Sequence, residues 1–193
     1  VELDQKWIPE TEGSALYIRP IVFATDECLG VRASERYRFL VFTGPVGPYY
    51  PKPVDILVAQ KYVRAFPGGV GFAKAAGNYA ATLKPAEMAK KMGFDQILWL
   101  DGLEFKYLQE CGTMNIFVVI NGKVLTPPTT DTILDGVTRD SILQLLKEKG
   151  LEVETRPITI DELIEAHQNG QLDEMFGSGT AAVVSHVNTI TYQ

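Results

Sequence analysis

The sequence predicts an α/β fold in which helices pack on a mixed sheet, and three observations indicate it. Short runs rich in β-branched and aromatic residues, including 15–24, 96–100 and 181–192, recur along the chain and are typical of strands. Between them lie longer segments with a helical apolar period, of which 132–150 is the clearest. At 193 residues, 46% of them hydrophobic, the chain can bury one substantial core.

Strand character dominates the first third of the chain. Residues 15–24 contain Pro20, which restricts that strand to a sheet edge or a bulge. Residues 36–43 and 54–65 predict two further strands. The segment 42–53 holds four prolines and two glycines, which is typical of a connection between domains.

The first predicted helix covers residues 78–91 and ends at Gly93. Pro85 lies inside it, and an interior proline removes one hydrogen bond and clashes with the preceding turn. We therefore expect a kink or a break near residues 82–84.

A hairpin and two more helices are predicted downstream. Asn121-Gly122, between strand-like residues 116–120 and 124–126, is a strong signal for a tight turn. The helix within 132–150 should bury a stripe made of residues 137, 141/142, 145 and 146.

The last helix begins at a capping box. Thr159 and Glu162 have the spacing of this motif, so the helix should run from there to Asn169 and stop at Gly170. A strand is predicted just before it, over 152–157.

Composition excludes several classes of partner. The net charge is −6 and the estimated pI about 5.0, without a long basic run, which argues against nucleic acid and anionic membranes. We find neither an apolar run of membrane-spanning length nor a signal peptide pattern. Cys28 and Cys111 match no metal or redox spacing, which suits a reducing cytoplasm.

Lys74 is the most informative single residue. It is the only cation between Arg64 and Lys84, and glycines, alanines and apolar residues surround it. If such a lysine is desolvated, its pKa falls and the neutral amine can attack carbonyls, as a Schiff base requires. The alternative is a surface loop in which Lys74 is solvated.

Two other glycine-rich signatures do not fit this stretch. A P-loop needs Gly-Lys-Ser/Thr, but Ala73 precedes Lys74 and Ala75 follows it. The dinucleotide fingerprint, started at Gly69, needs a glycine where Lys74 stands.

Five motifs, in one order, resemble those of the branched-chain amino acid aminotransferases, which are fold type IV pyridoxal-phosphate enzymes: GGVGFAKAAGNYAATL, QILWLDG, LQECGTMNIF, TPPTTDTILDGVTRDSIL and FGSGTAA. The resemblance extends over residues 17–182. It implies the mixed sheet of that family's large cofactor-binding domain, and it favours the cofactor lysine over the solvated loop.

By this resemblance the cofactor is pyridoxal 5'-phosphate, bound to Lys74 as a Schiff base. Tyr79 matches a tyrosine that hydrogen-bonds the cofactor's phenolic oxygen. Glu110 matches the carboxylate that keeps the pyridine nitrogen protonated; the alternative is a position on the open face of a strand. Arg64 matches an arginine near the cofactor, and the sequence leaves open whether it contacts the phosphate or supports Tyr79.

The resemblance also assigns the cofactor phosphate and the substrate. Gly136, Val137 and Thr138 match a phosphate-binding turn at a helix start, where unpaired N–H groups bind anions. Thr180 matches a further phosphate contact, and with the Ala181 amide it would also meet the substrate carboxylate.

Two residues in the first strand complete the implied substrate site. Tyr17 and Arg19 match a tyrosine and an arginine that approach the substrate carboxylate. The alternative for Arg19 is a charge on an edge strand that opposes aggregation.

The implied domain organisation has three parts. Residues 1–41 end the small N-terminal domain, 42–53 form an interdomain loop that closes over the substrate, and 54–193 are the large domain. Tyr49 and Tyr50 either line that loop or face solvent. Compared with those aminotransferases the chain is expected to be a fragment.

The implied reaction is transamination of leucine, isoleucine and valine with 2-oxoglutarate, in a homodimer or higher homo-oligomer. The alternatives are a D-amino acid aminotransferase, an aminodeoxychorismate lyase, or a fragment without turnover. The mechanism needs no metal, and it assigns no role to His167 or His186.

Overall fold

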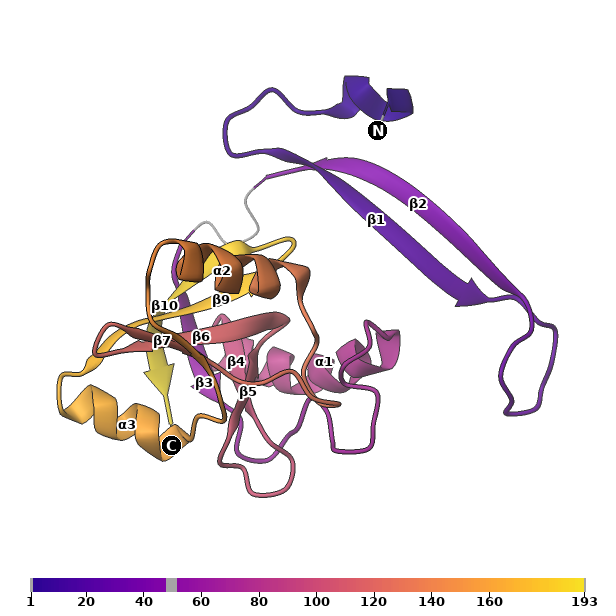
Figure 1. Cartoon of the computed structure of the whole chain (residues 1–193). Helices are drawn as coiled ribbons and strands as arrows, with labels where there is room; N and C mark the ends of the chain where they lie inside the picture. The colour runs from indigo at the N-terminus through magenta and orange to yellow at the C-terminus, as the bar shows by residue number, and fades with distance from the viewer. Residues whose placement is uncertain (1, 48–51, 193) are drawn as a thin grey trace. The chain divides into compact units, whose positions relative to one another are not determined.

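The computed structural model describes residues 2–47 and 52–192, in two compact units, 1–49 and 50–193 (Figure 1). The first unit is one antiparallel hairpin preceded by a short 3-10 helix: η1 (Glu2–Trp7), β1 (Ala15–Ala24) and β2 (Tyr37–Val46). Pro20 pairs with Val41, and a two-stranded sheet tolerates it because each strand has a free edge. None of its described residues is buried.

The connection predicted to begin at Phe42 begins later. Strand β2 continues through Gly44 and Pro45 to Val46, since these residues pair with β1. Tyr49 and Tyr50 lie outside the described residues.

Over its described residues, 52–192, the second unit contains eight strands in the order β5-β4-β3-β10-β9-β6-β7-β8, with parallel and antiparallel pairs. Strand β5 also pairs with the first residues of β6, so six of the strands close into a ring. The α/β prediction is confirmed. The strands are β3 (Val54–Val58), β4 (Gln96–Leu100), β5 (Leu108–Cys111), β6 (Met114–Ile120), β7 (Lys123–Thr126), β8 (Val153–Thr155), β9 (Leu172–Gly179) and β10 (Val183–Thr191).

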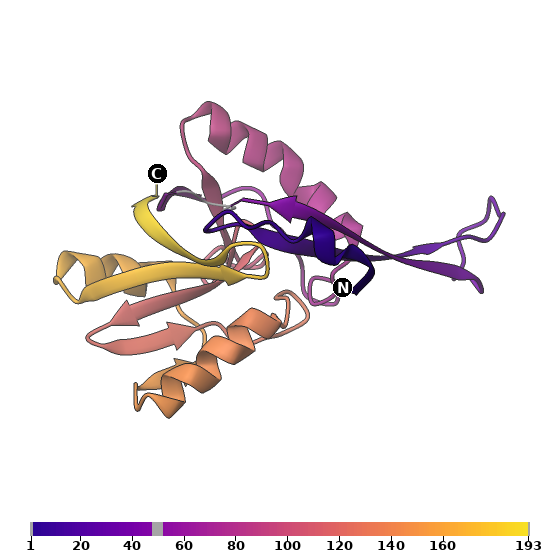
Figure 2. The same cartoon turned by 90° about the horizontal axis from the view of Figure 1, so that it is seen from above.

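Three helices cover this sheet. Helix α1 (Ala76–Lys91) packs on β4, α2 (Val137–Glu148) on β8 and β9, and α3 (Ile160–Gln168) on β9. Figure 2 shows α1 and α2 on opposite sides of the strands. No helix of the described residues is long and apolar enough to cross a membrane.

The strands and helices bury three apolar clusters. The largest includes Ile56, Leu98 and Ile116, each fully buried. Beneath α1, Ala89 packs with Trp99. Beneath α2, Ile142, Leu143 and Leu146 pack with Phe117 and Phe176, whose rings stack with centroids 4.9 Å apart.

Several local predictions are confirmed. Asn121 and Gly122 have φ of 51° and 73°, as expected of a tight turn joining β6 and β7. The Thr159 hydroxyl accepts the Glu162 N–H at 3.0 Å. The Glu162 carboxylate, however, pairs with Arg156 instead of completing the capping box.

Other local predictions are wrong. Helix α1 runs without a break across Pro85, which is buried. In α2 the inward side carries Arg139, Ile142, Leu143 and Leu146, whereas Val137 and Leu145 are 80% and 53% exposed. The strand expected over 54–65 ends at Val58. Residues 172–179, which carry most of FGSGTAA, form strand β9, for which no strand was predicted.

Candidate active site

Lys74 ends a long loop and stands two residues before α1. Its Nζ donates a hydrogen bond to the Tyr79 hydroxyl at 2.9 Å and lies 5.5 Å from the centre of that ring. The side chain is exposed, so the burial on which the sequence argument rested is not present in the structure. The position of Lys74 is fixed by the backbone of the loop that carries it.

The loop before Lys74 is held tightly. A Cβ on Gly71 would lie 2.5 Å from the Ala65 Cβ and 2.8 Å from the Thr132 Cα, so only glycine fits there. The Asn78 amide, from the first turn of α1, donates to the carbonyls of Val70 and Ala73 at 2.7 and 2.8 Å. The Asn78 side chain, which follows Lys74, therefore ties down the backbone that precedes it and fixes the place from which the lysine projects.

Glu110, on β5, forms the charged centre of the site. It is 2% exposed. One carboxylate oxygen forms an ion pair with the Arg64 Nε at 2.8 Å, and the other accepts the Leu134 N–H at 2.7 Å. Burial raises the pKa of Glu110 to about 7, against the opposing effect of the Arg64 guanidinium. The open-face alternative for Glu110 is wrong.

Arg64 has a role that the sequence did not indicate. Besides Glu110, its guanidinium donates to the carbonyls of Thr132, at 2.7 Å, and Gly71, at 3.1 Å. It thereby ties the loop that carries Lys74 to the carboxylate and to the segment before α2. These contacts account for the position of the Arg64 guanidinium without either of the two contacts left open earlier, to the phosphate or to Tyr79.

A row of polar side chains crosses three strands beside Glu110. Asn115 on β6 pairs with Glu110 on one side and with Ser178 of β9 on the other, so all three point to one face of the sheet. The Asn115 amide donates to the Leu134 carbonyl at 2.8 Å. Both polar backbone groups of Leu134 are therefore bound by this row.

Helix α2 begins at the same place. Its N-cap is Gly136, whose added Cβ would lie 2.1 Å from the Asn115 Oδ1. The first intrahelical bond runs from Asp140 to the Gly136 carbonyl, so the N–H groups of residues 137–139 have no partner within the helix. Such a helix start attracts anions.

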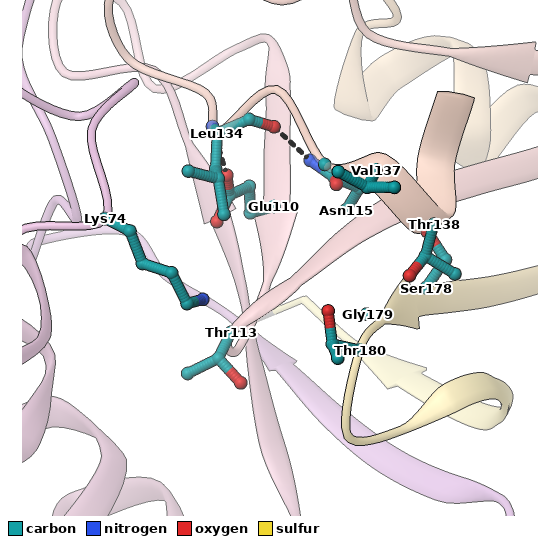
Figure 3. A pocket seen from close by; sticks show the side chains of 11 residues that line it. Lys74, Glu110, Thr113, Asn115, Leu134, Val137, Thr138, Ser178, Gly179 and Thr180 are labelled. Carbon is teal, nitrogen blue, oxygen red and sulfur yellow. Dashed lines mark hydrogen bonds between the residues drawn. The ribbon is translucent and has the colours of Figure 1, made fainter. Parts of the chain in front are cut away.

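These elements line a pocket with about 350 Å³ of empty space, a figure that includes space open to solvent (Figure 3). The lining residues are Lys74, Glu110, Thr113, Asn115, Leu134, Gly136, Val137, Thr138, Ser178, Gly179 and Thr180.

Most of the predicted cofactor residues are thus brought together. Arg64 and Tyr79 stand behind the lining, each bonded to one of its charged groups. Ala181 is exposed and lies outside the lining set. Sequence reasoning missed Thr113, Asn115 and Leu134, and it indicated Ser178 and Gly179 only as small residues that let a ligand approach the backbone closely. Asn115, Ser178 and Gly179 lie on strands, where a two-residue alternation is the available signal, and glycines interrupt that alternation in β9. Thr113 and Leu134 lie in a turn and a loop, where no such alternation exists.

Tyr17 and Arg19 lie in the first unit, on β1. The Arg19 guanidinium carbon is 4.8 Å from the centre of the Tyr17 ring, a cation–π contact. Arg19 is exposed and Tyr17 partly so.

A lysine, a buried carboxylate and a helix start around one pocket define the class of protein, and comparison with known families agrees. Residues 4–190 match the family described as amino-transferase class IV, and the chain belongs to that family.

Individual relatives and solved structures within this family are also similar to the chain. A probable branched-chain-amino-acid aminotransferase of Staphylococcus aureus is 55% identical over all of this chain, which covers 55% of that relative. The crystal structure of the Escherichia coli branched-chain amino acid aminotransferase is 32% identical with a TM-score of 0.76, over 91% of this chain and 56% of the other. An aminotransferase from Brucella abortus bound to the cofactor PLP is 26% identical with a TM-score of 0.79, over 93% and 62%. The chain therefore spans about half the length of the curated relative it matches.

Proposed function

We propose that this chain forms the cofactor pocket of a pyridoxal-phosphate transaminase for branched-chain L-amino acids. The observation that carries the proposal is that Lys74, Glu110 and the start of α2 line the same pocket. An amine, a carboxylate and an anion site are the three groups that the aldehyde, the ring nitrogen and the phosphate of this cofactor require. The relatives' names support the substrate class.

The residues present fit the cofactor at each end. Each Glu110 oxygen accepts one hydrogen bond and keeps a second lone pair for another donor. At the other end, the free N–H groups of α2 and the Thr138 and Thr180 hydroxyls suit phosphate oxygens. Lys74 lines the same pocket with a primary amine. When bound, pyridoxal phosphate supplies an electron-accepting ring.

The chain's own residues then divide the work. Lys74 would hold the cofactor through its primary amine, and the free amine would carry a proton to and from the substrate α-carbon. Tyr79 holds the lysine's nitrogen in place through the 2.9 Å bond. Arg64 favours the charged form of Glu110, because an adjacent guanidinium stabilises a carboxylate.

The proposal extends to the substrate, the assembly and the location. Tyr17, Arg19 and Ala181 are proposed to contact the substrate carboxylate, with 2-oxoglutarate as the amino acceptor. A homo-oligomer and a cytoplasmic location are also proposed; the two free cysteines are compatible with a reducing compartment. Sedimentation would give the oligomeric state.

The test is an absorbance spectrum with added pyridoxal phosphate, then borohydride reduction and peptide mapping. We expect a visible band and a reduced adduct on Lys74. Lys74→Ala should abolish both, while Lys84→Ala, an exposed lysine on α1, should keep them. Adducts spread over many lysines, or no band, would refute the proposed cofactor site.

Substrate choice has its own readout. L-Leucine should bleach the band and D-alanine should not. Bleaching by D-alanine alone would support the D-amino acid aminotransferase. A band that neither L-leucine nor D-alanine bleaches would mean that this chain binds the cofactor without turnover.

A further inference from the structure

Ser178 lines the pocket, but its hydroxyl has no assigned use. The residue is 1% exposed, and its Oγ has no hydrogen-bond partner among the described residues. A buried hydroxyl without a partner costs free energy, so folded chains rarely keep one without a reason.

The position of Ser178 suggests that reason. It shares a sheet face with Asn115, whose amide bonds the carbonyl of Leu134 just before α2. Helix α2 packs on β9, the strand of Ser178. In Figure 3, Ser178 and Thr138 lie on the side of the pocket away from Lys74.

Two independent features therefore meet in one place. The first turn of α2 offers backbone N–H groups without helical partners, and Ser178 offers an unpaired hydroxyl. Both are donors, and a hydroxyl turns freely about one bond to face a ligand. Donors gathered at a helix start favour a negatively charged ligand.

We propose that Ser178 is an anion-binding residue, whose hydroxyl donates to a phosphate oxygen of the ligand held at the start of α2. The inference deepens the proposed function, on which it rests for the identity of the phosphate monoester. Without ligand the hydroxyl stays unpaired, and with ligand it gains a charge-assisted hydrogen bond.

The chain provides a matched control. Ser185 on β10 is also buried with an unpartnered hydroxyl, but it pairs with Gly177 and so lies on the other face of the sheet from Ser178. It does not line the pocket.

The experiment compares Ser178→Ala and Ser185→Ala with the unchanged protein. Dissociation constants are measured for pyridoxal phosphate, for pyridoxal, which lacks the phosphate, and for inorganic phosphate. Ser178→Ala should weaken the two phosphate-bearing ligands about tenfold or more and leave pyridoxal unchanged. Ser185→Ala should change none of them.

Thermal unfolding without ligand adds a second readout. Since Ser178→Ala removes an unpaired hydroxyl, its Tm should equal or exceed that of the unchanged protein. Ser178→Cys, which keeps the side-chain shape with a somewhat larger atom and a weaker donor, should lose phosphate affinity in the same direction. A lowered Tm together with equal losses for pyridoxal and pyridoxal phosphate would mean a structural role and overturn the inference.

The two proposals fail separately. A normal Lys74 adduct with unchanged phosphate affinity in Ser178→Ala overturns the role of Ser178 and keeps the transaminase. Phosphate binding that needs Ser178, without any Lys74 adduct, keeps the anion site and overturns the pyridoxal-phosphate assignment.

Discussion

The hairpin of the first unit and the closed sheet of the second are built from similar residues but bury them very differently. Phe39 and Phe42 on β2 are 63% and 54% exposed, whereas Phe117 on β6 is fully buried. Aromatic and β-branched residues predict strands in both places. Burial comes from what packs on a strand, and only the second unit closes its strands into a ring beneath helices.

The difference shows that strand propensity and core formation are separate properties of this sequence. A two-stranded hairpin is marginally stable alone, because it has no second layer to cover its apolar face. The pocket, by contrast, is lined by residues from the ring and from α2, so its geometry is supported by a packed core.

The sharpest test of the comparison replaces one phenylalanine in each unit. Phe117→Ala removes a buried ring stacked on Phe176, so the free energy of unfolding should fall by about 3–5 kcal/mol. Phe42→Ala should change it by less than about 0.5 kcal/mol, as exposed positions do. Denaturant unfolding of both variants is the measurement. Equal losses would break the comparison, since the hairpin would then have a covered face.

The next largest effect is on pH dependence, and the two units should differ in sign. Folding raises the pKa of Glu110 from 4.5 to about 7, so the folded chain holds this proton more tightly than the unfolded chain. Glu110 therefore lowers the free energy of unfolding as pH rises from about 4.5 to 7, by roughly 3 kcal/mol. Glu110→Gln should flatten that fall.

Asp26, in the loop of the hairpin, is the matched carboxylate. The Glu35 N–H, with Arg32 and Arg36, holds the pKa of Asp26 below its usual range. Its stabilising effect is present above pH 3.8 and is lost as pH falls through the lower folded value. Carboxyl NMR titrations of the two residues should move in opposite directions, and a lowered value for Glu110 would contradict the prediction.

A smaller effect is expected from one added methyl group. In Gly136→Ala the new Cβ would meet the Asn115 Oδ1 at 2.1 Å, so the amide must leave the Leu134 carbonyl. We expect a loss of about 1–3 kcal/mol. Gly44→Ala, on the hairpin, meets nothing within 4 Å and should cost nothing.

A double variant identifies the clash. Asn115→Ala removes the obstructing oxygen, so adding it to Gly136→Ala should cost less than the two single losses summed. Additive losses would mean that the start of α2 is strained for another reason.

How far the sequence predicted this molecule depends on the kind of signal. The Asn121-Gly122 turn, the Thr159 cap and the strand 96–100 were predicted because each is decided by a few adjacent residues. Strand β9 was missed because glycines weaken its strand pattern, and its pairing to β6 and β10 is what makes it a strand. Pro85 was misjudged because helix packing outweighs one lost hydrogen bond.

The residues of the site divide in the same way, into those that local motifs predicted and those that long-range contacts position. Lys74 and Glu110 were found from motifs, and both line the pocket. The contacts of Arg64 join residues up to 68 positions apart, so no local pattern could indicate them. Asn115 and Ser178 gain their position from strand register, which depends on the ring as a whole.

Leu134 has an apolar side chain, yet its backbone affects which ligands the pocket can bind. The Leu134 N–H donates to Glu110, and the Leu134 carbonyl accepts from the Asn115 amide. Two residues later stands Gly136, the N-cap of α2. The spacing between the buried carboxylate and the helix start is thus set by a short piece of backbone tied at both polar groups. A molecule that must reach both ends at once is selected by its length, before any contact with its side groups is made.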